Sequence, residues 1–461
     1  MFKKETYVNR RARLKKDVGS GILLFLGNNE VGMNYLDNTF PYYQDASFNY
    51  FFGLKQANLT SIIDIDEDRE IIFGNELTID DIVWMGTLPT IDHNASLVGV
   101  KETAPTEKLA EYLKKAQKQG RKIHFLPPYR AEHNVTILNL LGIAPQDQEK
   151  AVSLDFIKAV VAQRNHKSAE EILEIEDACN ITADMHIAAM KAARPGMIEA
   201  EVAAAAHRVA IAADGELSFP IIATINGQTL HNHNHSNVIK EGQMLLIDCG
   251  ALNKNGYSGD MSSTFPVGHK FTTRQREIYE IALAAHNNAI DMLRPGTKFV
   301  DVHKHACSTI FDGLKALGLT KGDTHEAVEQ GAHALFFPCG LGHMMGMDVH
   351  DMENLGEVWV GYDGKPKSTV FGYKSLRLAR ELEPGFVLTI EPGIYFIPEL
   401  IDKWRAEKKF TEFLNYDAIE KYKGFSGCRN EEDFLITPEG SRLLGKPIPK
   451  SVEDVEKLRQ F

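Results

Sequence analysis

The sequence has few cysteines, and no two of them form a C-x-x-C pair. Its five cysteines are dispersed and odd in number, which is typical of reduced thiols rather than of a disulfide framework. Long apolar runs are also missing, since no stretch approaches the ~20 residues that a transmembrane helix needs. The charged N-terminus, MFKKETYVNRRARLKK, contains no apolar segment of the kind found in secretory signals. We therefore expect a cytoplasmic protein that does not associate with membranes.

The chain has no excess of positive charge either. It carries 51 Lys and Arg against 63 Asp and Glu, which gives a formal net charge of −12 at pH 7. A nucleic-acid-binding protein normally shows a basic face, so we expect no nucleic-acid partner. With 43% hydrophobic and 25% charged residues the composition is that of a globular enzyme. A chain of 461 residues is too long for one ordinary core, so more than one domain is expected.

Residues 1–164 are predicted to form a small α/β domain. Short apolar runs predict strands at 21–27, 61–66 and 69–74. Amphipathic patterns predict helices at 105–119 and 129–141. Near 164–171, polar residues precede a long helical pattern that Ser168 and Glu171 would begin with a capping box. This change of pattern predicts a second domain at 165–461.

The second domain contains sequence patterns that occur twice. Helical patterns end in Arg-Pro-Gly at 194–196 and again at 294–296, and each is followed by a second amphipathic stretch, at 199–213 and 299–317. Further along, EGQMLLIDCG and EPGFVLTIEPG each place an acid six residues after one glycine and two residues before the next. Two kinds of repeated pattern in the same order predict an internal duplication. Approximate twofold symmetry would bring the acids that end the two apolar strands to one centre.

Three acids are placed where acids are unusual. Asp248 closes the apolar run MLLID and Glu391 closes VLTIE, although acids rarely end buried strands unless they are paired or bound to a cation. Asp260 follows a turn-rich segment, NKNGYSG, that predicts a hairpin with Asp248 opposite Asp260. Two bare carboxylates in contact repel, so such a pair needs a metal or a raised pKa. Each acid alone is more simply a solvent-facing strand end, but the duplicated arrangement favours convergence.

A third acidic cluster occurs in CRNEEDFLIT, residues 428–437, ahead of another apolar run. Glu431, Glu432 and Asp433 are all candidates for the same centre. Alternation along a strand excludes only one of them from the face of Glu431. The choice therefore stays open on the pattern alone.

Two histidines and a histidine repeat are candidate ligands. His343 lies among glycines, Met and Phe in FFPCGLGHMMGMDVHD, and His350 follows seven residues later. A lone histidine in apolar surroundings is more often a core residue, although the glycines permit close approach of the backbone. The repeat HNHNH at 231–235 imitates a three-histidine site but sits in a polar, Asn-rich, loop-like segment. His303 and His305 fall in a helical pattern and are interpreted as ordinary helix residues.

These segments together resemble the pita-bread metallopeptidases and, among them, the Xaa-Pro aminopeptidases (aminopeptidase P). The matching segments are LLIDCG, GYSGDMSSTFPV, GLGHMMGMDVHD, TIEPGIYF and the R-x-E element of GCRNEEDFLIT, which appear in family order. The resemblance implies that the metal ligands are Asp248, Asp260, His343, Glu391 and Glu431. It thereby selects Glu431 from the three neighbouring acids.

The resemblance also implies two divalent metal ions. Asp260 and Glu431 would bridge them, Asp248 would complete one site, and His343 with Glu391 would complete the other. Four carboxylates and one histidine form an oxygen-rich set that suits manganese, with iron, cobalt and zinc as competitors.

Further site residues are implied in the same way. The expected catalytic residues are His231, His350 and Glu391, and the expected substrate contacts are Asp37, Trp84, Tyr395 and Arg429. In this interpretation His350 stabilises the oxyanion, and Glu391 passes a proton to the leaving proline nitrogen.

The expected fold is mixed α/β (α+β), with a creatinase-like N-terminal domain and a pita-bread catalytic domain. The segment DNTFPYYQDASFNYFFGL, residues 37–54, resembles the N-terminal domain of these aminopeptidases. The implied activity is hydrolysis of the N-terminal Xaa-Pro bond of peptides whose second residue is proline. Since oligomers are common among relatives, we also expect a homodimer or homotetramer.

Two alternatives and two departures accompany this hypothesis. The alternatives are a prolidase, which cleaves Xaa-Pro dipeptides, and a non-catalytic peptide-binding scaffold on the same fold. The loop between Asp248 and Asp260 is one residue longer than the usual pattern, which predicts a bulge at the hairpin tip. The segment 351–382 is longer than in compact members and is expected to flank the site.

Overall fold

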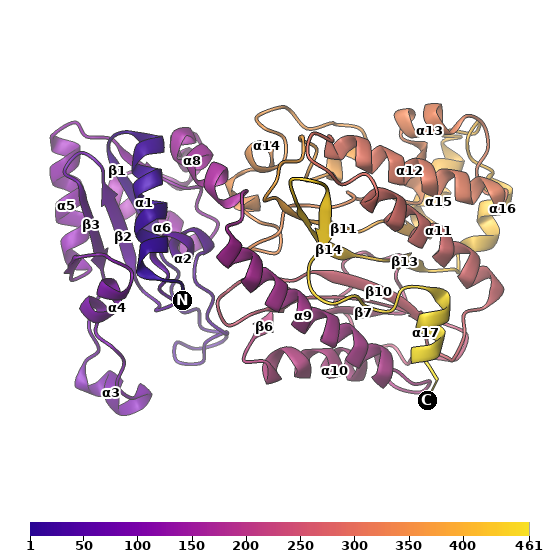
Figure 1. Ribbon diagram of the computed structural model, residues 1–461, viewed down its shortest axis with the longest axis horizontal. Coiled ribbons are helices and arrows are strands. Elements are labelled where there is room, and N and C mark those ends of the chain that lie inside the picture. The colour runs from indigo at the N-terminus through magenta and orange to yellow at the C-terminus, as the bar shows by residue number, and fades with distance from the viewer. Residues whose placement is uncertain (461) are drawn as a thin grey trace. The chain divides into compact units, whose positions relative to one another are not determined.

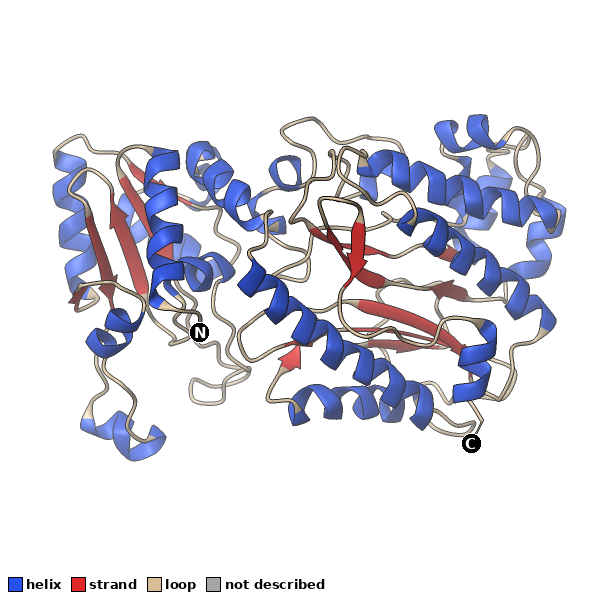
Figure 2. Cartoon of the chain, viewed as in Figure 1, coloured by secondary structure: helices blue, strands red, loops and turns tan. Residues whose placement is uncertain are grey.

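The computed structural model describes residues 1–460, which form two compact units. The first unit is Met1–Arg164 together with Asn354–Gly356, and the second contains the remaining described residues. Figure 1 labels the elements, and Figure 2 shows helices and strands intermixed in both units. The fold is mixed α/β, as expected from the sequence. Within residues 1–460, no helix has the length and apolar character required to cross a membrane.

The first unit is built on a five-stranded sheet of order β4-β3-β2-β1-β5. Its elements are α1 (Lys4–Val18), β1 (Ile22–Leu26), α2 (Ala46–Phe52), β2 (Thr60–Asp64), β3 (Arg69–Phe73), α3 (Ile79–Met85), α4 (Ile91–Leu97), β4 (Glu102–Ala104), α5 (Glu107–Lys118), β5 (Ile123–Phe125), α6 (Ala131–Leu141), α7 (Pro145–Ala151) and α8 (Leu154–Arg164). Strands β1, β2 and β3 are antiparallel neighbours, whereas β4 and β5 join the two edges in parallel. The predicted strands and helices of this unit are all present.

The second unit begins with two helices and a three-stranded antiparallel sheet of order β10-β8-β7. These elements are α9 (Ala169–Ala192), α10 (Glu199–Ala212), β6 (Glu216–Leu217), β7 (Ile222–Thr224), β8 (Met244–Cys249), β9 (Ala251–Leu252) and β10 (Met261–Pro266). Helix α9 starts with the predicted capping box, in which the Ser168 hydroxyl accepts from the Glu171 amide. Helices α9 and α10 pack on each other and on these strands, and their alanine-rich faces complete one core.

The remaining half repeats the order of two helices and then strands. Its elements are α11 (Thr273–Ile290), α12 (Phe299–Ala316), α13 (Thr324–Gln330), η1 (Ala332–Leu335), η2 (Glu353–Leu355), α14 (Glu357–Val360), η3 (Tyr373–Ser375), β11 (Val387–Ile390), β12 (Gly393–Tyr395), α15 (Pro398–Ala406), α16 (Tyr416–Ile419), η4 (Glu420–Tyr422), β13 (Gly427–Arg429), β14 (Glu432–Ile436), β15 (Ser441–Leu443) and α17 (Val452–Leu458). Strands β11, β14 and β15 form one sheet, and β12 pairs with β13. The helix pair α11–α12 therefore corresponds to α9–α10, and β11 corresponds to β8, as the duplication predicts (Figure 1).

The β8–β10 hairpin differs from the sequence prediction in its register. Asp248 lies opposite Ser262 rather than Asp260, which precedes the first residue of β10. The register that pairs Asp248 with Ser262 also sets Leu252 opposite Ser258, so no bulge interrupts the hairpin between these pairs. The extra residue therefore lies in the turn between Leu252 and Ser258, at the tip of the hairpin, and the ladder before the turn stays regular.

Candidate metal centre

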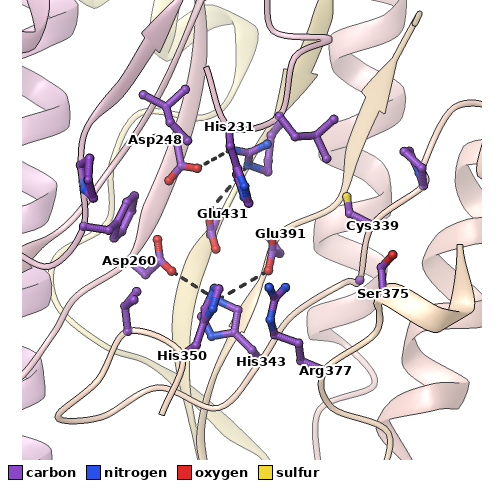
Figure 3. A pocket seen from close by; sticks show the side chains of 18 of the residues that line it. His231, Asp248, Asp260, Cys339, His343, His350, Ser375, Arg377, Glu391 and Glu431 are labelled. Atoms are coloured by element: carbon purple, nitrogen blue, oxygen red, sulfur yellow. Dashed lines mark hydrogen bonds and ion pairs between the residues drawn. The ribbon is translucent and has the colours of Figure 1, made fainter. Parts of the chain in front are cut away.

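The second unit contains a cavity of about 510 Å³ that opens to solvent. Most of the carboxylates and histidines predicted for the site line it. Figure 3 shows Asp248, Asp260, Glu391 and Glu431 pointing into one space, with His231 on one side and His343 and His350 on the other. The five residues implied as metal ligands therefore meet, although they span positions 248 to 431.

The β8–β10 hairpin supplies the first two acids. Asp248 is the fifth residue of β8, and Asp260 comes just before β10. Because Asp260 and Ser262 are two residues apart, they face the same side of the chain, and Ser262 pairs with Asp248. Both carboxyl side chains thus reach the cavity from one face of the hairpin, although the two acids are not direct cross-strand partners.

The third and fourth acids come from the other half of the duplicated unit. Glu391 directly follows β11, and Glu431 lies between β13 and β14. A β-bridge joins Glu431 to Ser262, and the Ser262 hydroxyl donates a hydrogen bond of 2.7 Å to Glu431 Oε2. This bridge connects the two halves and fixes the Glu431 carboxylate next to the β8–β10 hairpin.

The two acids after Glu431 have other partners. The Glu432 carboxylate lies 3.6 Å from Lys450 Nζ and 3.8 Å from His286 Nε2, on the opposite side of the strand. Asp433 accepts hydrogen bonds from the Asp260 amide at 3.0 Å and from the Cys179 thiol at 3.1 Å. Only Glu431 among the three lines the cavity. Geometry and resemblance therefore select the same residue.

His343 is oriented for binding a cation. Its Nδ1 lies 3.0 Å from the Met344 carbonyl, which can accept the ring proton and leave Nε2 as the free ligand atom. Nε2 lies 3.3 Å from Asp260 Oδ2 and 3.7 Å from Glu391 Oε1. Burial lowers the pKa of His343, which favours the neutral imidazole that metals require.

The converging acids are electrostatically unfavourable without a cation. Burial, followed by the neighbouring carboxylates, raises the pKa of Asp260 and of Glu431 well above their ordinary values. Burial also raises the pKa of Glu391. Asp248 Oδ1 is buried and has no hydrogen-bond partner in the described part of the chain. Acids that repel one another and a buried orphan oxygen both indicate missing positive charge.

The donor set fits two divalent cations. The ligand atoms of Asp260, His343 and Glu431 all lie within 4.8 Å of one another, close enough to surround a shared ion. Asp248 and Glu391 line the same cavity and offer further oxygens. Carboxylates and one imidazole suit hard or borderline divalent ions.

Arg429 is the buried cation of the site. Its guanidinium donates to Asp248, to the Ser262 hydroxyl at 2.8 Å and to the Tyr395 hydroxyl at 2.8 Å. Because each of its nitrogens already has a partner, the arginine holds Asp248 in place instead of waiting for a ligand. The sequence predicts Tyr395 as a substrate contact, but the structure buries its side chain completely behind Arg429. In this geometry Tyr395 supports Arg429, and a contact between Tyr395 and substrate stays a prediction.

The predicted catalytic histidines lie on opposite sides of the cavity. The His350 ring packs against the His343 ring, with centroids 4.3 Å apart, and its Nδ1 lies 2.5 Å from Glu353 Oε2. Burial, and secondly the neighbouring His343, lowers the pKa of His350 to about 4. His231 and His233 both reach the cavity from an irregular loop, not from a strand. The HNHNH repeat therefore forms no shared strand face, as its composition indicates.

Two predicted substrate contacts are in the first unit. Asp37 lies in an exposed turn, and Trp84 lies on α3 with 87% of its surface exposed. Neither belongs to the residues that line the cavity of the second unit. Their role as substrate contacts stays a prediction.

The structure adds cavity residues that the sequence interpretation did not select. Ser375 and Arg377 come from the long segment after His350, and Cys339 precedes the His343 loop. Arg377 Nε lies 3.4 Å from Glu353 Oε2. The segment 351–382 therefore flanks the site, as expected, and contributes side chains to its wall.

Comparison with known families matches both parts of the chain. The description of metallopeptidase family M24 matches residues 174–438, which include all five candidate metal ligands. The aminopeptidase P N-terminal domain matches residues 7–124. One family therefore accounts for more than half of the chain, and a second for most of the first unit.

Full-length relatives carry two kinds of name. The Xaa-Pro aminopeptidase of Escherichia coli is 30% identical over 99% of this chain and 97% of its own length. The human Xaa-Pro dipeptidase is 28% identical over 96% of this chain and 90% of its own length. The similarity to both kinds of enzyme thus extends over nearly the whole sequence.

Solved structures of aminopeptidase P are also similar to this chain over nearly its full length. A variant of Escherichia coli aminopeptidase P in complex with substrate matches with a TM-score of 0.82 at 28% identity, covering 99% of this chain and 98% of the other. The zinc-substituted enzyme in complex with product matches with a TM-score of 0.81 and the same identity and coverage. The Pseudomonas aeruginosa aminopeptidase PepP matches with a TM-score of 0.82 at 25% identity, again over 99% and 98% of the two chains.

Proposed function

Because this chain belongs to metallopeptidase family M24 and carries an aminopeptidase P N-terminal domain, we propose that its cavity cleaves the bond between the first residue and a following proline. The chain is a metal-dependent peptidase that uses two divalent ions. One observation carries the two-metal part of this proposal: four carboxylates and a histidine converge in one cavity, burial raises the pKa of Asp260 and Glu431, and the buried Arg429 pairs with Asp248 alone among these acids by hydrogen bonding. Manganese is the proposed metal, since oxygen ligands dominate the set.

The ligand roles are those that the resemblance implies. Asp260 and Glu431, whose ligand atoms lie within 4.8 Å of each other, would be shared by the two ions. Asp248, held by Arg429, would complete one site, and His343 with Glu391 would complete the other. When bound, the ions supply an activated water and positive charge against the scissile carbonyl oxygen.

His350 is proposed to handle a proton at its Nε2 atom. Glu353 Oε2 lies 2.5 Å from His350 Nδ1, where it can accept a hydrogen bond from that nitrogen. In this tautomer Nε2 would accept a hydrogen bond from a substrate N–H or a water. The oxyanion-stabilising role that the resemblance implies requires a proton on Nε2 and stays a prediction.

Glu391 and His231 complete the proposed machinery. Glu391 is proposed to pass a proton to the leaving proline nitrogen, as the resemblance to the family implies. His231 reaches the cavity on the side of Asp248, opposite His343, where it can contact the substrate (Figure 3). The other proposed properties are peptide substrates with proline second, a homo-oligomeric assembly and a cytoplasmic location.

A substrate series tests the proposal. The metal-loaded protein is expected to release the first residue from an Xaa-Pro-Yaa tripeptide and to act far more slowly on Xaa-Ala-Yaa. Mass spectrometry of the products distinguishes this release from cleavage elsewhere. Equal rates on the two tripeptides would contradict the proline requirement. A protein that retains neither metal nor turnover would instead be the non-catalytic scaffold.

One observation favours the prolidase alternative. Arg377 lines the cavity, and its Nε lies 3.4 Å from Glu353 and 3.5 Å from Glu357 without a well-aligned hydrogen bond among residues 1–460. A guanidinium in this position can pair with the free carboxylate of a dipeptide. The nearby acids Glu353 and Glu357 reduce, but do not remove, this attraction.

Replacing Arg377 with glutamine separates the two activities. If a dipeptide carboxylate binds there, KM for Xaa-Pro is expected to rise about 10–100-fold, because a charge-assisted hydrogen bond contributes ~1.5–3 kcal/mol. KM for Xaa-Pro-Yaa, whose carboxylate lies one residue further on, is expected to change little. Arg380→Gln is the matched control, since Arg380 comes from the same segment but does not line the cavity. Equal changes for both substrates would exclude a carboxylate-binding role.

A further inference from the structure

A second group of metal-binding side chains lies outside the carboxylate centre. His303 and Cys307 are one turn apart on α12, and His333 comes from η1. One ligand atom from each residue lies within 4.8 Å of the others, and Cys307 Sγ is 3.5 Å from His303 Nε2. All three side chains are buried, with 0%, 0% and 1% of the His303, Cys307 and His333 surfaces exposed. The group therefore has the composition and the spacing of a metal site.

Three ring nitrogens of this group have no well-aligned hydrogen bond. His303 Nδ1 and both nitrogens of His333 are buried without such a bond within the described residues, although the Val328 backbone lies close enough to His333 to raise its pKa. A neutral imidazole always carries one N–H donor and one acceptor, so a buried ring with neither satisfied is unusual. Histidines that serve only as packing residues normally have at least one partner. Two adjacent rings with three orphan nitrogens indicate a missing ligand.

The protonation states suit a cation. Burial lowers the pKa of His303 to about 3 and the pKa of His333 to about 4, so both rings are neutral and offer lone pairs at physiological pH. Burial, followed by Cys339, raises the pKa of the Cys307 thiol. A metal reverses this last effect, because it binds the thiolate and displaces the proton. With both rings neutral, the thiolate of Cys307 is the one negative charge that the cluster would offer to a bound cation.

We propose that His303, Cys307 and His333 bind a zinc ion, in a site separate from the dinuclear centre. Two imidazoles and one thiolate form a softer donor set than the carboxylates of the cavity, and zinc accepts both nitrogen and sulfur ligands. No acid belongs to the cluster, so manganese has no preference for it. This inference does not rest on the proposed proline specificity.

The cluster supplies three of the four donors that tetrahedral zinc takes, and its position would let the bound ion join two elements of the fold. Aromatic rings enclose it: Phe337 and Tyr373 have centroids 5.7 and 5.5 Å from that of His303. The zinc ion would fasten α12 to η1. The chain after η1 leads directly into the cavity wall, which contains Cys339 and His343. Zinc would thereby hold the start of that wall against α12.

Cobalt spectroscopy on the full-length protein tests the proposal. A cobalt ion bound to a thiolate gives sulfur-to-metal charge-transfer absorption in the near ultraviolet, whereas a centre of carboxylates and one histidine does not. The protein is stripped with a chelator, reloaded with Co²⁺, and compared with Cys307→Ser and with His333→Gln. The charge-transfer band is expected in the wild type and in neither variant. Zinc-loaded wild type is also expected to retain one more equivalent of zinc than either variant, by elemental analysis.

Cys339→Ser is the matched control. Cys339 lies in the carboxylate cavity, so it is the thiol that could give a similar band from the catalytic centre. The band is expected to survive in this variant. The proposal is overturned if the wild type shows no band and no extra zinc, or if the band disappears with Cys339 instead. Circular dichroism of the variants distinguishes loss of the site from loss of the fold.

Discussion

Replacing Glu431 with glutamine is expected to lower kcat/KM by about 10³-fold or more, equivalent to ~4 kcal/mol of transition-state stabilisation. Glu431 is proposed to bridge both ions, so the amide removes a charge from each site at once. The fold is expected to survive, because glutamine matches glutamate in shape and can still bond the Ser262 hydroxyl. Steady-state kinetics and metal analysis of the purified variant measure both effects.

The neighbouring acid provides a control. Glu432 is also buried, but its carboxylate faces Lys450 and His286 instead of the cavity. Glu432→Gln is expected to keep two catalytic metal equivalents and near wild-type kcat/KM, with some loss of stability because Lys450 loses its ion pair. Equal losses of activity in the two variants would mean that the site depends on general packing of β14 and not on ligation by Glu431.

The sequence contains a local signal for most of this centre. Asp248 and Glu391 end apolar strands, and an acid at a buried strand end conflicts with ordinary burial unless a cation compensates it. The duplicated pattern then predicts that both acids meet. The pattern alone does not decide among Glu431, Glu432 and Asp433, because the choice depends on where β14 begins and on the side of the chain that each side chain takes.

Other features of the site have no local signal. Tyr395 lies beside the metal ligands in sequence, yet it packs behind Arg429, a relationship that only the β12–β13 pairing creates. Arg377 reaches the cavity through a long irregular segment whose path has no periodic pattern. The register of the hairpin also eluded prediction, since turn length alone does not decide whether Asp248 pairs with Asp260 or with Ser262.

The histidine–cysteine cluster was missed for a different reason. His303 and Cys307 stand four residues apart in a helical pattern, which places them on one face and was available from the sequence. His333 is thirty positions further on, however, and nothing in its own surroundings connects it to α12. Such a cluster can be recognised only in the folded structure, where several polar atoms are buried close together without hydrogen bonds.

Removing the metal ions is expected to lower Tm, and to lower it more as the pH rises. Without cations, burial and the neighbouring carboxylates raise the pKa of Asp260 and Glu431. An acid whose pKa is higher in the folded state binds more protons folded than unfolded. Its contribution to stability is therefore lost as the pH increases from its unfolded pKa, about 4, through its folded pKa.

Bound metal has the opposite dependence, because it requires deprotonated ligands and binds better at higher pH. An ion present at 100 times its Kd adds ~2.7 kcal/mol per site, which for two sites corresponds to a Tm difference on the order of 5–10 °C. Calorimetry of chelated and manganese-loaded protein between about pH 5 and pH 8 measures this difference, which is expected to widen with pH. Chelated Glu431→Gln is the control: with one repelling acid removed, its Tm is expected to fall less steeply with pH than that of the chelated wild type. A difference that narrows with pH, or identical slopes for the two chelated proteins, would show that these acids do not require a cation.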